Sequence, residues 1–334
     1  MKVGLVGFAG SGKTTVFNTM TGLHVPVGYG GEVRLGTVRV PDERIDRLSQ
    51  IFKPKKTTYA EIAFCDVPGE HGAEKKGLST KSLQQIRDQE ALCLVLRDFD
   101  NPAVEGKVDP LADLELIERR LARAQKEKAP PAEVAMFELM KGVLEDGRPL
   151  RSVPATQLDR SQLKNYVFLT DRPLLVALNC DESRAAAAMP GPLADRIAAF
   201  SAAGLVLSAS VEAEIAGLPP EEQKAFLDDL GVSESALSRF IRAAYGLLDL
   251  ISFFTVGEDE VRAWTIRRGT NARVAAGRIH SDLERGFIRA EVIPYKVFVQ
   301  YGSEHAVKEA GKLQVEGKEY VVADGDIMHV RFNV

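Results

Sequence analysis

The sequence contains little cysteine, and its cysteines lie in apolar surroundings. Only three of the 334 residues are cysteine, namely Cys65, Cys93 and Cys180, and each lies in or beside an apolar, strand-like run. Their number is odd and their spacing matches no metal cage, which argues against a disulfide framework and a zinc site. Four of the five histidines are scattered and show no metal-ligand spacing either. We therefore expect buried, reduced thiols in a cytoplasmic protein.

Long apolar runs and a strong excess of one charge are also missing. No apolar run approaches the length that spans a bilayer. Lys2 is followed by too few apolar residues for a signal peptide before the first glycines. The formal net charge is −4, a mild value that gives no indication of DNA or of a membrane surface as a partner. The length suffices for two domains.

The beginning of the chain carries its most specific motif. The apolar run MKVGLVGF predicts a strand over residues 1–8, and it leads into GFAGSGKT, which has the G-x-x-x-x-G-K-[ST] form of a phosphate-binding loop. The helix predicted over residues 13–21 points its positive end at the same place. A glycine-rich turn is the alternative, but the strand before and the helix after favour phosphate binding. The residues expected to hold the phosphates are Gly7, Ala9, Gly10, Ser11, Gly12, Lys13, Thr14 and Thr15.

Two residues of this loop and a later aspartate are candidates for phosphate and metal chemistry. Lys13 is expected to neutralise the β- and γ-phosphates, and Thr14 to offer its hydroxyl to Mg²⁺. The strand predicted over residues 57–67 ends in the D-x-x-G motif Asp66-Val67-Pro68-Gly69. Asp66 is expected to reach Mg²⁺, and the Gly69 amide to bond the γ-phosphate. An ordinary β-turn is the alternative for this motif.

Glu70 and His71 follow the D-x-x-G motif, and both have two interpretations. A polar residue at this point can position the attacking water, as a glutamine does in many GTPases, and a neutral His71 could do so. Both are therefore candidate catalytic residues beside Lys13. The alternative, which we favour, is a pair of solvated loop residues, because two adjacent side chains cannot both be aimed at one water.

Two more strand ends predict the part of the site that reads the base. The run over residues 173–178 ends in Asn179-Cys180-Asp181-Glu182, and the run over 205–207 ends in Ser208-Ala209. Ligands bind at the carboxyl edge of open α/β sheets, so Asn179, Glu182, Ser208 and Ala209 are the candidate base contacts. Glu182 stands where guanine-reading N-K-x-D motifs carry aspartate, and Cys180 replaces the lysine. We therefore expect ATP to bind at least as tightly as GTP.

The remaining pattern divides the chain into three parts. We predict an α/β nucleotide-binding domain with a mostly parallel sheet over residues 1–110 and 166–249. Within it we expect a helix over 41–52, capped by Asp42, and a helical stretch over 221–248, with Ser233 as a second N-cap. Two charged helices, 111–128 and 132–145, predict an inserted helical arm over 111–165. Residues 250–334 are rich in strands, predicted over 251–256, 261–266, 287–292, 320–322 and 327–332. With one helix over 303–310, these strands suggest a small β-grasp domain.

The chain resembles the YchF family, the Obg-like ATPases of the translation-factor class of P-loop proteins. The similarity is strongest in SASVEAEI (208–215), FIRAAYGLLDLISFFTVGEDEVRAWTI (240–266), AAGRIHSDLERGFIRAEVI (275–293) and the final GKEYVVADGDIMHVRFNV. It implies a G-type nucleotide-binding domain with a helical arm and a C-terminal TGS domain of β-grasp type. It also implies binding and hydrolysis of ATP or GTP and association with the ribosome. The arm and the TGS domain, which carries arginines near Trp264, are the candidate surfaces for ribosomal RNA.

Several positions depart from the family pattern. Gly10 stands where the family has an asparagine associated with the use of a monovalent cation, and VGYGGEV (27–33) offers no aligned threonine to close on Mg²⁺. Glu70 replaces a hydrophobic residue after D-x-x-G. No arginine finger is evident within the chain, so we expect slow hydrolysis by the isolated protein. Two functions stay open: a hydrolysing switch on the translation machinery, and a binding module that holds nucleotide with little or no hydrolysis. A small-molecule kinase is disfavoured, since no acceptor pocket or lid arginines are recognisable.

Overall fold

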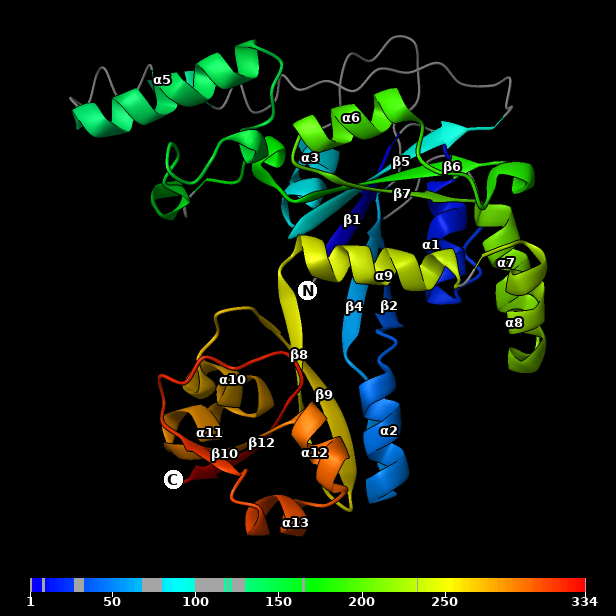
Figure 1. The fold of residues 1–334 in the computed structure, drawn as a ribbon. Coiled ribbons are helices and arrows are strands. Elements are labelled where there is room, and N and C mark those ends of the chain that lie inside the picture. The colour runs from blue at the N-terminus through cyan, green and yellow to red at the C-terminus, as the bar shows by residue number, and fades with distance from the viewer. Residues whose placement is uncertain are drawn as a thin grey trace. The chain divides into compact units, whose positions relative to one another are not determined.

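The computed structural model describes residues 2–7, 10–26, 33–67, 80–99, 117–118, 120–121, 130–163, 166–232 and 234–333. The chain forms two compact units. The first consists of Met1–Val38 and Ala63–Leu247, and the second of Arg39–Ile62 and Leu248–Val334. Each unit has its own six-stranded sheet (Figure 1).

The sheet of the first unit confirms the predicted α/β class. Its strands follow the order β2-β4-β1-β5-β6-β7, and β1 pairs in parallel with β4 and β5, β5 with β6, and β6 with β7. Parallel pairing places the carboxyl ends of these strands at one edge of the sheet. The parallel strands are β1 (Lys2–Val6), β4 (Glu61–Asp66), β5 (Ala91–Asp98), β6 (Leu174–Cys180) and β7 (Ala203–Leu207), and β2 (Arg34–Arg39) lies beside β4 at the end of the order.

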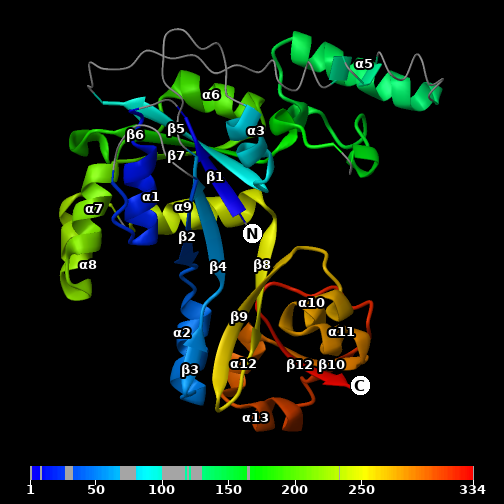
Figure 2. The same cartoon turned by 180° about the vertical axis from the view of Figure 1, so that it is seen from behind.

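Helices cover both faces of this sheet. α6 (Gly191–Ala199) lies on one face and α9 (Ala236–Leu247) on the opposite face (Figures 1 and 2). The other described helices are α1 (Lys13–Thr21), α3 (Thr80–Arg87), α7 (Ala209–Gly217) and α8 (Pro220–Asp229). The stretch predicted as helical over 221–248 is therefore two helices. The chain turns between them at Gly231, whose φ of 70° suits glycine, and the expected cap Ser233 lies outside the described residues.

The inserted arm has a small core of its own. Of its first predicted helix, 111–128, only Ile117, Glu118, Arg120 and Leu121 are described. The second is α5 (Pro131–Glu145), which begins with proline at its first turn, where the missing N–H costs nothing. Short 3₁₀ turns follow at Leu150–Ser152, Arg160–Leu163 and Leu169–Asp171. The core contains Ile117, Leu121, Phe137, Met140, Val143, Leu144, Leu150, Val153, Leu158, Leu163 and Phe168.

The second unit combines the C-terminal residues with a segment from the N-terminal half. Its sheet has the order β11-β10-β12-β8-β9-β3. The strands are β3 (Lys56–Thr58), β8 (Leu250–Thr255), β9 (Glu260–Arg267), β10 (Phe287–Pro294), β11 (Gln314–Glu316) and β12 (Asp326–Phe332). The helices are α2 (Glu43–Phe52), α10 (Ala272–Ile279), α11 (Ser281–Arg285), α12 (Tyr295–Tyr301) and α13 (Glu304–Glu309).

Two expectations for this unit were wrong. One helix was expected over 303–310; it exists as α13, capped by Ser303, but the short helices α10, α11 and α12 were not expected. Residues 320–322 form no strand, since only Val321 makes a single bridge to Asn271. The Tyr320 hydroxyl instead donates a hydrogen bond to Asp326 Oδ2, at 2.8 Å.

Residues 39–62 were assigned to the nucleotide-binding domain from the sequence, but they cluster with the C-terminal residues. The strand predicted over 57–67 is in fact two strands in two sheets. β3 pairs in parallel with β9, and β4 joins the sheet of the first unit. Phe52 of α2 stacks on Phe298 of α12, with ring centroids 5.3 Å apart. These non-local contacts decide where the segment belongs.

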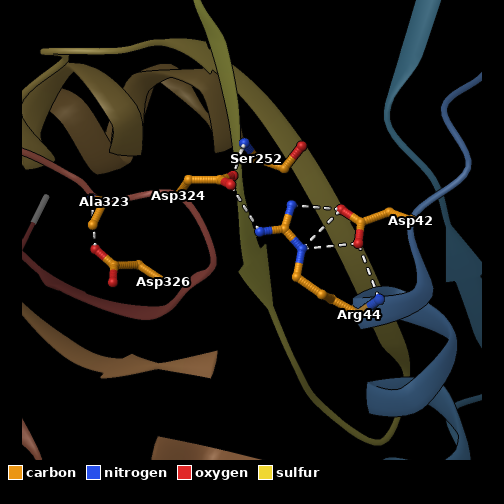
Figure 3. Close-up of polar contacts among 6 residues, drawn as sticks. All are labelled: Asp42, Arg44, Ser252, Ala323, Asp324 and Asp326. Atoms are coloured by element: carbon orange, nitrogen blue, oxygen red, sulfur yellow. Dashed lines mark hydrogen bonds and ion pairs between the residues drawn. The ribbon is translucent and has the colours of Figure 1, made fainter. Parts of the chain in front are cut away.

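Arg44 ties α2 to the C-terminal part of the second unit (Figure 3). As expected, Asp42 caps α2: its Oδ1 accepts from the Arg44 amide at 3.0 Å. The Arg44 guanidinium bonds the Asp42 carboxylate and forms an ion pair of 3.0 Å with Asp324 Oδ2. Asp324 Oδ1 also accepts from the Ser252 amide at 3.0 Å. Burial alone would lower the pKa of Arg44, but its bonds to the two carboxylates outweigh burial and raise it.

We expect Arg44→Ala to lower the free energy of unfolding by about 1–3 kcal/mol, because the largely buried carboxylate of Asp42 and the more exposed one of Asp324 lose their shared partner. Arg47→Ala is the matched control: Arg47 is exposed on the same helix, and its loss should change stability by less than about 0.5 kcal/mol. Urea unfolding followed by circular dichroism measures both. Equal effects of the two substitutions would contradict the role given to Arg44.

Candidate nucleotide-binding site

Three glycines shape the loop between β1 and α1. Gly7, Gly10 and Gly12 have φ values of 145°, 72° and 88°, a region that other residues rarely adopt. A Cβ on Gly7 would lie 2.5 Å from the Val95 carbonyl oxygen, and one on Gly12 would lie 2.2 Å from Asn179 Nδ2. The loop therefore needs glycine at both points, for conformation and for space.

Lys13 begins α1 directly after this loop and is 7% exposed. Its ammonium donates to the Gly7 carbonyl oxygen at 2.8 Å, so the side chain folds back over the loop. Burial lowers the pKa of Lys13, and the negative charge of Asp66 partly offsets that shift. A buried ammonium with a lowered pKa gains from any additional anion placed beside it, such as a phosphate.

Thr14 and Asp66 lie together although 52 residues separate them in the sequence. The Thr14 hydroxyl donates to Asp66 Oδ2 at 2.9 Å. Asp66 is 3% exposed, and its Oδ1 has no hydrogen-bond partner among the described residues. The same is true of Ser11 Oγ in the loop. Buried polar atoms without partners are rare in folded proteins. They fit a site whose remaining partners come with the ligand.

These residues fit Mg²⁺ with a nucleotide phosphate. A hydroxyl and a carboxylate are hard oxygen ligands, and Mg²⁺ commonly takes one or two protein ligands and completes its shell with water and phosphate oxygens. In the described part of the chain, no group of three or more His, Cys, Asp or Glu side chains forms a metal cage. An ion held by Thr14 and Asp66 would therefore depend on the phosphates for much of its coordination.

Asn179 connects two loops of the site. It ends β6 and is 4% exposed. Its Nδ2 donates to the Ser11 carbonyl oxygen at 3.1 Å, and its Oδ1 accepts from the Ala209 amide at 3.0 Å. The carboxamide thus holds the phosphate loop to the N-terminus of α7 and keeps one N–H for a further acceptor. A contact of Asn179 with the base stays a prediction, and the geometry adds a bracing role that the sequence did not reveal.

The other base-reading candidates differ in exposure. Glu182 is exposed and opens the 3₁₀ turn Glu182–Arg184, while Ser208 is buried with its hydroxyl 3.0 Å from that of Ser210. Cys180 is buried, and its thiol donates to the Leu207 carbonyl oxygen at 3.2 Å. Cys180 thus stands at the position of the lysine in N-K-x-D motifs, but its thiol bonds the neighbouring strand β7.

The structure brings together only part of the predicted site. Ten of the predicted site residues lie at the carboxyl ends of β1, β4, β6 and β7 or in the segments that follow these strands. They are Gly7, Gly10, Ser11, Gly12, Lys13, Thr14, Asp66, Asn179, Ser208 and Ala209. Thr15 is half-buried on α1. Ala9, Gly69, Glu70, His71 and the glycine-rich segment 27–32 lie outside the described residues, so their roles stay predictions.

One charged neighbour of the site was missed. Arg34 Nη1 lies 3.9 Å from Asp66 Oδ2 and 3.3 Å from the Pro26 carbonyl oxygen. Arg34 is the first residue of β2 and follows the glycine-rich segment 27–32 by one residue. The sequence pattern carries little signal for the start of this strand, because RLGTVR exposes Leu35 and turns Gly36 inward.

Comparisons with known proteins agree with this arrangement. Residues 2–136 match a family model described as 50S ribosome-binding GTPase, and residues 250–333 match the model of the YchF-type GTPase C-terminal domain, described as a protein of unknown function. The chain is 40% identical to the Ribosome-binding ATPase YchF of Bacillus subtilis, over 100% of both chains. It is 41% identical to the protein of the same name from Haemophilus influenzae, over 100% of this chain and 99% of the relative.

A solved structure shows the same fold. The YchF GTPase of Schizosaccharomyces pombe superimposes with a TM-score of 0.86 at 29% identity, covering 99% of this chain and 97% of the other. Similarity of sequence over the whole length and similarity of fold thus lead to one conclusion: the chain belongs to the YchF family of P-loop NTPases.

Proposed function

We propose that the chain binds ATP or GTP with Mg²⁺, hydrolyses it slowly, and acts as a nucleotide-dependent switch on the ribosome. The observation that carries the nucleotide part is the placement of buried Lys13 and Asp66 and half-buried Thr14 together beside a glycine loop. The ribosomal part of the proposal rests on the relatives and the matching family model, which are described as ribosome-binding proteins.

The side chains of the cluster have distinct tasks in this proposal. Lys13 exchanges the Gly7 carbonyl oxygen for the β- and γ-phosphates, and the loop amides together with the positive end of α1 bind the phosphate oxygens. Thr14 and Asp66 hold Mg²⁺ in place of their mutual hydrogen bond. The bound ion supplies neutralisation of the charge that develops on the transferred phosphoryl group. Asn179 keeps the loop in position during these exchanges.

A second candidate function is a nucleotide-binding module with little or no hydrolysis. The observation behind it is the composition of residues 27–33, which supply no threonine to close on Mg²⁺. The two functions differ in turnover: a switch should release phosphate from ATP faster with ribosomes than without, and a pure binding module should release none in either case.

Co-sedimentation with ribosomes tests the proposed switch. We expect the wild-type chain to bind ribosomes differently with ATP and with ADP. Lys13→Ala should lose this dependence, because it loses the charge that binds the β- and γ-phosphates, and its ATP affinity should fall by at least about tenfold. A thermal melt establishes that the variant is folded, and calorimetry with ATP establishes that it has lost affinity for the nucleotide. If the wild-type chain binds ribosomes equally well with ATP and with ADP, the proposed switch is refuted.

The same site predicts weak discrimination between bases. Glu182 is exposed, and its longer side chain places the carboxylate poorly for the two hydrogen bonds that aspartate makes to guanine. Each such contact is worth about 1–3 kcal/mol when its loss leaves a group unpaired. We therefore expect ATP to bind at least as tightly as GTP in competition measurements with Mg²⁺. A preference for GTP of about a hundredfold or more would contradict this reading.

A further inference from the structure

Arg34 is a half-buried cation beside the metal-binding pair of the proposed site. Its Nη1 approaches Asp66 Oδ2 to 3.9 Å, and Oδ2 is also the oxygen that accepts the Thr14 hydrogen bond. The guanidinium therefore stands next to the atoms proposed to hold Mg²⁺. This metal bridges the β- and γ-phosphates in P-loop NTPases, so a group beside it is also close to those phosphates.

The backbone of Arg34 is firmly placed. β2 lies next to β4, which ends in Asp66, within the six-stranded sheet. Two residues after Arg34, a Cβ on Gly36 would lie 2.4 Å from Thr21 Cγ2 of α1 and 3.1 Å from Phe17 Cζ. This close packing of β2 on α1 connects the strand directly to the helix that follows the phosphate loop. The position of Arg34 relative to Thr14 is thus set by rigid elements.

The guanidinium has hydrogen-bonding capacity to spare. Its contacts with Asp66 and with the Pro26 carbonyl oxygen both use Nη1. Among the described residues, Nε and Nη2 meet no acceptor, although a guanidinium carries five N–H donors in a fork that matches phosphate oxygens. A cation that only neutralised Asp66 would be expected to bond it in two-pronged fashion.

Metal binding changes the balance of charge around Arg34. Without Mg²⁺, Asp66 is the carboxylate that Arg34 faces. Once Asp66 faces Mg²⁺, the guanidinium and the ion repel one another across one carboxylate, and Arg34 gains by turning to another anion. Lys13 and the loop amides are assigned to the β- and γ-phosphates, but the γ-phosphate is terminal and has three non-bridging oxygens, so it can accept a further donor.

We propose that Arg34 reads the γ-phosphate: it pairs with Asp66 when no triphosphate is bound and bonds the terminal phosphate when one is. This inference rests on the proposed function, since it assumes the same nucleotide site. Through this contact, Arg34 would distinguish a bound triphosphate from a bound diphosphate. The contact would come from β2, because the preceding residues 27–33 offer no threonine for it.

Calorimetric titration of the full chain with ATP and with ADP, both with Mg²⁺, tests the assignment. Arg34→Gln should weaken ATP binding by at least about tenfold and ADP binding by less than about threefold, because only the triphosphate offers the lost charge-assisted contact. Arg34→Lys keeps the charge without the fork, so its ATP affinity should be intermediate. Arg39→Gln is the matched control, since it removes one positive charge from an exposed site on the same strand. It should change neither affinity.

The possible outcomes separate the inference from the proposed function. If the wild-type chain binds neither nucleotide, both fail. If the wild-type chain binds both and Arg34→Gln weakens ATP and ADP equally or not at all, only the inference fails, and Arg34 is a structural partner of Asp66. The melting midpoint of nucleotide-free Arg34→Gln should stay within about 4 °C of the wild type, because Arg34 is partly exposed and its 3.9 Å contact with Asp66 is long. A folded variant with a selective loss of ATP affinity supports the assignment.

Discussion

The buried carboxamide of Asn179 is the contact on which the geometry of the nucleotide site depends. It bonds the Ser11 carbonyl oxygen and the Ala209 amide, two groups that belong to loops far apart in the sequence. At 4% exposure neither bond can be replaced by bulk water, and a buried polar group left without a partner costs about 1–3 kcal/mol. The same side chain packs so closely on Gly12 that a Cβ there would collide with it. The phosphate loop is therefore braced from the sheet before any ligand binds.

On this braced frame, the site sets an excess of positive charge around one carboxylate. Lys13 and Arg34 both interact electrostatically with Asp66, which is buried and accepts a hydrogen bond from Thr14. An acceptor atom of Asp66 and the hydroxyl of Ser11 have no partners in the described part of the chain. Such a cluster has the charge and the open hydrogen-bonding positions that a metal–triphosphate complex would fill. Its own contacts, Lys13 on Gly7 and Arg34 on Asp66, are ones that the phosphates would displace.

Much of this arrangement could be predicted because it depends on local sequence. The phosphate loop requires glycine where φ is positive, and α1 was expected over the residues it occupies. Asp42 was identified as a cap because a short acidic side chain before an amphipathic run bonds the first free amides. The pattern of strands suggested a small β-grasp domain in the C-terminal part, and the family resemblance implied the same fold.

What could not be predicted depends on contacts between distant residues. The apolar run over 57–67 looks continuous, but the chain divides at Tyr59 and Ala60, and its halves pair in different sheets. The residues of 320–322 resemble a strand, yet the structure gives them only an isolated bridge between Val321 and Asn271. Asn179 looked like a base contact because its motif ends a strand, and only the structure shows what its amide already binds. The contact of Arg34 with Asp66 was hidden for the same reason, since Asp66 lies 32 residues further along the chain.

The central claim is that Thr14 and Asp66 form a magnesium site that works only together with a nucleotide. The most direct test is the gain in ATP affinity when Mg²⁺ is added, measured by calorimetry with and without a chelator. The wild-type chain should gain about tenfold or more in ATP affinity, and so should Thr37→Ala, a control at an exposed threonine of β2. Thr14→Ala should lose most of that gain. An equal gain in Thr14→Ala and the wild type, or none in the wild type, would contradict the account.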